Sequence, residues 1–132
     1  MTTDALLAEL AAIVGPAHLL SAAADLAPYL TDWRGRYCGM AQCVVRPGNA
    51  AEVAAVVGAC VAAGAPIVPQ GGNTSLCGAA TPDGEGRAVV VSLSRLNRIV
   101  AVDPQNNTIS VEAGCTLAAV QEAARAADRL FP

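Results

Sequence analysis

Lysine is absent from this chain, aromatic residues are scarce, and there is a single histidine, His18. The eight basic residues are therefore all arginines, they form no cluster, and the formal net charge is −3. An acidic chain without a basic patch is poorly suited to nucleic acid, so we expect no nucleic-acid partner. Because aromatic residues make up only 3% of the 132 residues, Ala, Val and Leu must fill the core through many small contacts.

Paired cysteine motifs are also missing. The count is odd and no two cysteines have CxxC spacing, which indicates neither a disulfide framework nor a metal site. The five are Cys38, Cys43, Cys60, Cys77 and Cys115. Free thiols are typical of a reducing compartment, so we expect a cytoplasmic protein, with Cys60 in the core.

No long uninterrupted hydrophobic run is present. The longest apolar stretch, residues 50–68, contains a glutamate, two glycines and a proline, which is typical of a helix, a turn and a strand. Asp4 and Glu9 stand where a signal peptide would carry basic residues. We therefore expect neither a transmembrane segment nor a secretory signal.

The hydrophobic pattern predicts a single α+β domain. Helices are expected near residues 4–14, 22–26, 50–63 and 117–128, and strands near residues 43–46, 65–69 and 87–93, followed by an antiparallel hairpin within 96–112. Asn49 and Glu52 form a capping box for the third helix. The strand–helix–strand order from 43 to 69 predicts a small parallel βαβ unit. We expect N-terminal helices and a lead-in segment over 1–40 and a second part over 41–132.

The segment over residues 29–40, called the lead-in loop below, is irregular and carries the only tryptophan. Trp33 has two interpretations: it lines a site, or it anchors the loop by packing on the body of the domain. Arg34 and Arg36 are the basic residues of this loop and are expected to be solvated.

The most informative stretch is residues 69–78, called the glycine loop below, which follows a short apolar strand. Paired glycines followed by Asn-Thr-Ser offer bare backbone N–H groups and two hydroxyls at one place, as a phosphate or pyrophosphate requires. The glycines would permit left-handed backbone angles and a close approach to the ligand. A surface turn is the competing interpretation.

Three motifs in order carry a family resemblance. They are Val-Val-Arg-Pro-Gly at 44–48, Pro-Gln-Gly-Gly-Asn-Thr-Ser-Leu at 69–76, and Val-Ser-Leu-Ser-Arg-Leu-Asn at 91–97, followed by a hairpin and Glu-Ala-Gly-Cys-Thr-Leu at 112–117. Together they resemble the N-terminal part of the FAD-binding domain of the vanillyl-alcohol oxidase / p-cresol methylhydroxylase (PCMH) flavoproteins. The branch of D-lactate, glycolate and D-2-hydroxyglutarate dehydrogenases is the most similar. The resemblance implies a PCMH-type FAD-binding fold that this chain contains only in part.

The resemblance also implies the residues that would contact FAD. These are Pro47, Gln70, Gly71, Gly72, Asn73, Thr74, Ser75, Leu76, Gly78, Leu93, Gly114 and Cys115. The glycine loop would hold the pyrophosphate, Leu93 would lie near the adenosine end, and Gly114 and Cys115 would pass beside the dinucleotide. Simple strand stops remain alternatives for Pro47 and Gly114.

Asn73 departs from one pattern of the family. Members with covalent flavin on this loop carry His directly after the paired glycines, so the resemblance implies non-covalent FAD here. It also implies that the catalytic residues, the metal ligands and the substrate domain follow later in the family's chains. Residues 1–132 would then contain none of them. The apolar ending at residue 132 leads us to expect a chain cut within its fold.

Two functions remain open from the sequence. The first is the FAD-binding segment of a 2-hydroxy-acid dehydrogenase or oxidase, inactive alone, whose partners are FAD and, in the complete enzyme, a small hydroxy acid; a homodimer is one oligomeric option. The alternative is a truncated, non-catalytic nucleotide-binding or interaction module. An NAD-type Rossmann domain ranks low, because no GxGxxG motif links a strand to a helix.

Overall fold

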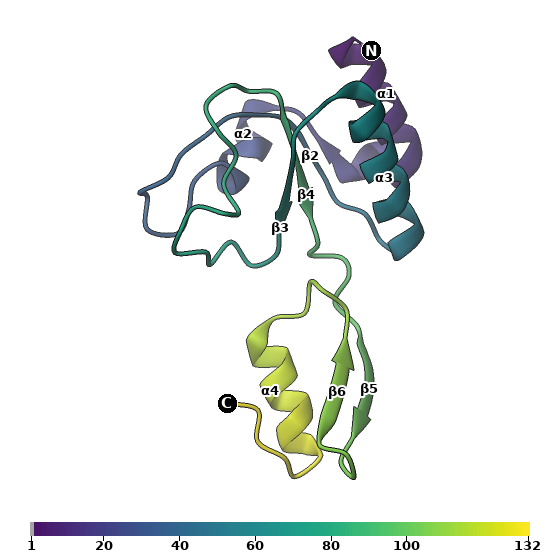
Figure 1. Cartoon of the computed structure of the whole chain (residues 1–132), viewed down its shortest axis with the longest axis vertical. Helices are drawn as coiled ribbons and strands as arrows, with labels where there is room; N and C mark the ends of the chain where they lie inside the picture. The colour runs from purple at the N-terminus through teal and green to yellow at the C-terminus, as the bar shows by residue number, and fades with distance from the viewer. Residues whose placement is uncertain (1) are drawn as a thin grey trace.

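The computed structural model describes residues 2–132. These residues form two parts joined by a short connection. The larger part is a four-stranded sheet with helices on both faces, and the smaller part is a hairpin covered by one helix (Figure 1). This mixed arrangement confirms the predicted α+β class.

The elements follow the predicted order closely. The helices are α1 (Thr3–Val14), α2 (Ala23–Leu26), α3 (Ala50–Ala63) and α4 (Leu117–Ala126), with 3-10 turns at Pro16–His18 and Ala27–Tyr29. The strands are β1 (Leu19–Leu20), β2 (Ala41–Val45), β3 (Ile67–Gln70), β4 (Ala88–Ser92), β5 (Ile99–Asp103) and β6 (Thr108–Val111).

Local capping chemistry explains where α3 begins and ends. Asn49 Oδ1 accepts a hydrogen bond from the Glu52 N–H at 2.9 Å, and the Glu52 carboxylate accepts one from the Gly48 N–H at 2.7 Å. This is the predicted capping box. The helix ends at Gly64, whose φ of 63° is left-handed, a conformation that favours glycine.

The order of the strands corrects one prediction. Strands β2 and β3, on either side of α3, do not pair with each other, because β4 lies between them and is parallel to both. All five residues of β4 are buried, so this most apolar segment takes the central position. The two-residue strand β1 pairs antiparallel with β2 and was not predicted.

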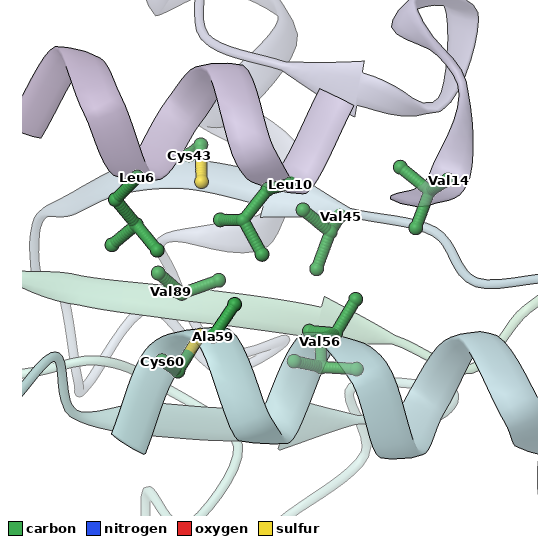
Figure 2. Close-up of a cluster of buried hydrophobic side chains, with 10 residues drawn as sticks. Leu6, Leu10, Val14, Cys43, Val45, Val56, Ala59, Cys60 and Val89 are labelled. Carbon is green, nitrogen blue, oxygen red and sulfur yellow. The ribbon is translucent and has the colours of Figure 1, made fainter. Parts of the chain in front are cut away.

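The core lies between this sheet and two helices. Helices α1 and α3 cover the same face, and Leu6 and Leu10 from α1 meet Val56 and Cys60 from α3 over Val89 of β4 (Figure 2). All five side chains are buried, which confirms Cys60 as a core residue. The opposite face of the sheet is covered by α2 and the turn after it.

Trp33 does not anchor the lead-in loop. Its side chain is 61% exposed, and its ring lies 5.2 Å below the Arg34 guanidinium instead of packing on the body of the domain. The anchor interpretation is therefore wrong.

The smaller part is the predicted hairpin. Strands β5 and β6 pair antiparallel, and α4 buries Val120 and Ala124 against them. The chain returns from this hairpin through Gly114, whose N–H donates to the Leu96 carbonyl at 2.7 Å. This contact closes the connection between the two parts.

Candidate functional site

The carboxyl ends of three parallel strands bring the predicted site residues to one edge of the sheet. Residues 46–49 follow β2, residues 71–78 follow β3 and residues 93–96 follow β4. The Leu93 N–H donates to the Gln70 carbonyl at 2.9 Å, and Arg95 Nη1 donates to the Arg46 carbonyl at 2.7 Å. Ligands of open α/β sheets bind at this edge, where the strand order reverses.

The paired glycines are exposed and unconfined. A Cβ atom built on Gly71 meets nothing within 4 Å, and one on Gly72 meets only Thr74 Cγ2 at 3.9 Å. Neither paired glycine has a positive φ, so the left-handed angles expected of the loop's glycines occur only at Gly78 (φ 75°); Asn73 (φ 54°) is left-handed as well. The protein's own packing therefore does not require glycine at 71 and 72.

Only one end of the Asn73 side-chain amide has a hydrogen-bond partner. Its Nδ2 atom donates to the Thr31 carbonyl of the lead-in loop at 2.8 Å, whereas its Oδ1 atom is buried with no hydrogen-bond partner in the described structure. An unpaired buried acceptor is costly, so it calls for a donor from a bound molecule. A phosphate oxygen is itself an acceptor, so Oδ1 suits a ligand hydroxyl or ring N–H instead.

Gln70 fixes the base of the loop. Its side chain is buried, and Nε2 donates to the carbonyls of Tyr29 at 3.0 Å and Ala80 at 2.8 Å. The structure thus gives the Gln70 side chain a bracing role that the sequence did not reveal. The contact of Gln70 with a cofactor stays a prediction.

The rest of the loop is shaped by one hydroxyl and one aromatic ring. Ser75 Oγ accepts hydrogen bonds from the N–H groups of Cys77 at 3.4 Å and Ala79 at 3.2 Å. A Cβ atom on Gly78 would lie 2.8 Å from Cγ of Tyr37, so glycine lets the ring pack closely. Thr74 and Leu76 are exposed beside the paired glycines and are available to a ligand.

Pro47 and its neighbours form a charged corner at the end of β2. Pro47 is fully buried, and Arg95 approaches Gly48 and lies 3.8 Å from the Glu52 carboxylate. Arg95 therefore ties the segment after β4 to the N-terminus of α3. Burial of Pro47 fits the strand-stop interpretation, and its contact with a cofactor stays a prediction.

Gly114 is required by the chain itself. A Cβ atom there would lie 1.8 Å from the Leu93 carbonyl oxygen, which no side chain can tolerate. The adjacent Cys115 is half-buried, and its Sγ lies 3.4 Å from the Arg98 carbonyl oxygen. Leu93, Gly114 and Cys115 thus meet at the connection between the two parts, and their contacts with a dinucleotide stay predictions.

Asp32 is the charged group most deeply set in the lead-in loop. Its side chain is buried and accepts hydrogen bonds from the N–H groups of Tyr37 at 2.8 Å, Arg36 at 2.7 Å and Arg34 at 3.3 Å. These hydrogen bonds, that of Tyr37 foremost, hold the pKa of Asp32 below its ordinary value. An Asp followed three residues later by Gly is a sequence signal for this turn, but the turn was not predicted from it.

The cysteines, the acidic and histidine side chains and the helix lengths describe the rest of the chain. All five cysteines are free thiols. Within residues 2–132, no three Asp, Glu, His or Cys side chains are grouped so that they could hold a metal ion. In the same range, no helix is long and apolar enough to cross a membrane.

A comparison with known families identifies the family of this chain. Residues 41–132 match the family described as FAD binding domain, which covers the sheet edge, the glycine loop and the hairpin. The chain belongs to this FAD-binding family. The resemblance found in the sequence is thereby confirmed, and FAD is the cofactor of this family.

The relatives found by sequence are hydroxy-acid enzymes. The chain is 36% identical over 131 residues to the D-2-hydroxyglutarate dehydrogenase of Xanthomonas citri pv. viticola, covering 98% of this chain and 27% of that protein. It is 30% identical over 114 residues to the glycolate oxidase subunit GlcD of Bacillus subtilis, covering 86% of this chain and 24% of that protein. The chain therefore spans about a quarter of the length of these two curated relatives.

The solved structures confirm the predicted PCMH-type fold. A p-cresol methylhydroxylase with bound substrate superposes with a TM-score of 0.80 at 22% identity, covering 95% of this chain and 25% of that one. An alkyldihydroxyacetonephosphate synthase superposes with a TM-score of 0.82 at 20% identity, covering 96% of this chain and 25% of that one. At 20–22% sequence identity, the structural similarity supports the fold alone.

The residues at the sheet edge fit a dinucleotide. Gly71 and Gly72 leave space that the chain does not fill, and the unpaired Asn73 Oδ1 calls for a ligand donor. FAD has ribityl and ribose hydroxyls and a flavin N–H as donors, and a pyrophosphate that backbone N–H groups can bind. Both features suit FAD.

Proposed function

We propose that this chain is the part of a flavoprotein oxidoreductase that holds FAD while a 2-hydroxy acid of the D-lactate, glycolate or D-2-hydroxyglutarate class is oxidised. The observation that carries the proposal is the unfilled space over Gly71 and Gly72 at the carboxyl edge of a parallel sheet. Gly58 and Gly84 also face open space, so it is the position of Gly71 and Gly72 at this edge of the sheet that favours a ligand passing close to the backbone.

The chain's own residues would bind and orient the cofactor. Backbone N–H groups of the glycine loop would bind the pyrophosphate, with the exposed Thr74 hydroxyl beside them. Asn73 would accept a hydrogen bond from a hydroxyl or N–H of the cofactor instead of contacting phosphate. When bound, FAD supplies the acceptor for the hydride from the substrate's α-carbon.

The flavin is proposed to be held without a covalent bond. The loop carries Asn73 where covalently flavinylated members carry histidine, and the only histidine, His18, precedes β1. The substrate class rests on relatives named D-2-hydroxyglutarate dehydrogenase and glycolate oxidase subunit. The base that takes the hydroxyl proton and the groups that bind the carboxylate are proposed to lie outside residues 1–132, so that this segment alone is inactive.

An anaerobic absorbance spectrum of the complete gene product tests this function. The purified protein is expected to be yellow, and D-2-hydroxyglutarate, D-lactate or glycolate is expected to bleach its visible flavin band, with L-lactate as the control. A yellow protein that none of the three acids bleaches would contradict the substrate class. A protein that takes up no FAD would instead favour a non-catalytic interaction module.

The proposal also predicts that the isolated 132-residue chain binds FAD weakly, because part of the cofactor's surroundings would be missing. Fluorescence titration should give a dissociation constant well above about 1 μM. Tighter binding by the isolated chain would show that residues 1–132 form the whole binding site.

A further inference from the structure

The lead-in loop is joined to the glycine loop at the positions where the glycine loop needs an unusual backbone. The Thr31 carbonyl accepts a hydrogen bond from Asn73 Nδ2 at 2.8 Å, and the Tyr37 ring packs against Gly78. Asn73 and Gly78 are the two residues of the glycine loop with positive φ, at 54° and 75°. The lead-in loop therefore braces both left-handed turns.

Asp32 lies between the two bracing residues of the lead-in loop. Its N–H donates to the Tyr37 carbonyl at 3.0 Å, and its carboxylate accepts hydrogen bonds from the N–H groups of Arg34, Arg36 and Tyr37. These bonds close the turn over 32–37, at whose two ends Thr31 and Tyr37 contact the glycine loop. In Figure 1 this blue loop and the teal glycine loop lie together beside α2.

We infer that Asp32 is a positioning residue for FAD binding, which acts on the glycine loop through Thr31 and Tyr37. Asp32 is 4% exposed and lies about 40 residues away in sequence from the loop it supports. Loss of its hydrogen bonds releases the turn, and the Thr31 carbonyl then no longer restrains Asn73. This inference rests on the proposed function of the glycine loop.

The experiment compares two turns of the complete protein, each closed by hydrogen bonds to an aspartate carboxylate. Asp103 is the matched control, since it closes the β5–β6 turn by accepting from Gln105 N–H at 3.0 Å and Asn106 N–H at 3.2 Å. Apoprotein of wild type, Asp32→Ala and Asp103→Ala is titrated with FAD, and the thermal unfolding of each is recorded. Asp32→Ala should weaken FAD binding about tenfold or more, and Asp103→Ala less than about twofold.

A double-mutant cycle separates positioning from a general loss of stability. In an Asn73→Gly background, which keeps the left-handed turn but removes the tether, Asp32→Ala should cost at least about threefold less FAD affinity than in wild type. An undiminished effect, or equal effects of Asp32→Ala and Asp103→Ala on FAD affinity, would overturn the inference. A wild-type protein that binds no FAD would overturn the proposed function instead.

A second variant covers the case in which Asp32→Ala does not fold. Tyr37→Leu leaves the Asp32 turn intact and removes the ring that packs on Gly78. It should weaken FAD binding about threefold or more, because the glycine loop loses one of its two braces. Unchanged FAD affinity in folded Tyr37→Leu would overturn the inference.

Discussion

Single glycines near the sheet edge serve opposite needs. Gly114 is enclosed by the carbonyl oxygens of Leu93 and Leu96, at 1.8 Å and 2.8 Å from a Cβ atom built there, whereas Gly71 faces open space. The chain's own packing thus requires glycine at 114 and does not require it at 71. A sequence cannot separate these cases, because both positions read as glycine after a strand.

Alanine substitution at these two glycines should give opposite stability results. Gly114→Ala should lower the free energy of unfolding by about 3 kcal/mol or more, because the backbone of Leu93 must move away. Gly71→Ala should change it by less than about 1 kcal/mol. Urea unfolding of both variants measures this, and equal losses would contradict the assignment of Gly71 to a ligand.

Burial sets the reactivity of the thiols. Burial raises the pKa of Cys43 to about 12, with a smaller contribution from Cys60, whereas Cys38 and Cys77 are exposed. Because the thiolate is the nucleophile, iodoacetamide should alkylate Cys38 and Cys77 in the native protein and Cys43 only after unfolding. Mass spectrometry of digests after timed labelling checks the order. Early labelling of Cys43 would show that the core is open.

At the scale of elements, local signals predicted helices better than sheet order. The boundaries of α3 follow from Asn49, Glu52 and Gly64, which are readable in sequence because caps act within four residues. The insertion of β4 between β2 and β3 depends on burial of the whole segment and not on any neighbouring residue. For the same reason the bond between Thr31 and Asn73 was not predicted, since these residues are 42 positions apart.

The cap of α3 gives a prediction for this scale. Asn49→Ala removes the acceptor of the Glu52 N–H and should lower the free energy of unfolding by about 1 kcal/mol. Asn49→Ser, which keeps an acceptor, is the control and should recover most of that loss. Equal destabilisation by Ala and Ser would show that the cap contributes little.

At the scale of the whole molecule, hydrogen bonds stabilise the ionised form of three separate carboxylates, Asp32, Asp103 and Glu112. Hydrogen bonds lower the pKa of Asp32 through the Tyr37 N–H, of Asp103 through the Asn106 side chain, and of Glu112 through the Arg98 side chain. Each folded carboxyl thus holds its proton less tightly than the unfolded one, whose ordinary pKa is 3.8 for Asp and 4.5 for Glu. Their stabilisation is complete above those values.

Acid should therefore destabilise the protein in a defined direction. Below about pH 4.5 the unfolded state binds more protons than the folded state, so the free energy of unfolding should fall as pH is lowered through the folded pKa values. Urea unfolding at steps from about pH 6 to about pH 3 measures the slope. A stability that stays level or rises over this range would contradict the hydrogen-bonded carboxylates.

The binding of FAD at the paired glycines is tested most directly by one titration of the complete apoprotein. Gly71→Ala combined with Gly72→Ala places methyl groups in the space over the loop, while Gly58→Ala on the exposed side of α3 is the control. The double variant should weaken FAD binding by about tenfold or more with little loss of stability, and Gly58→Ala should leave the affinity unchanged. Unchanged FAD affinity in the folded double variant would contradict the assignment of the glycine loop to the cofactor.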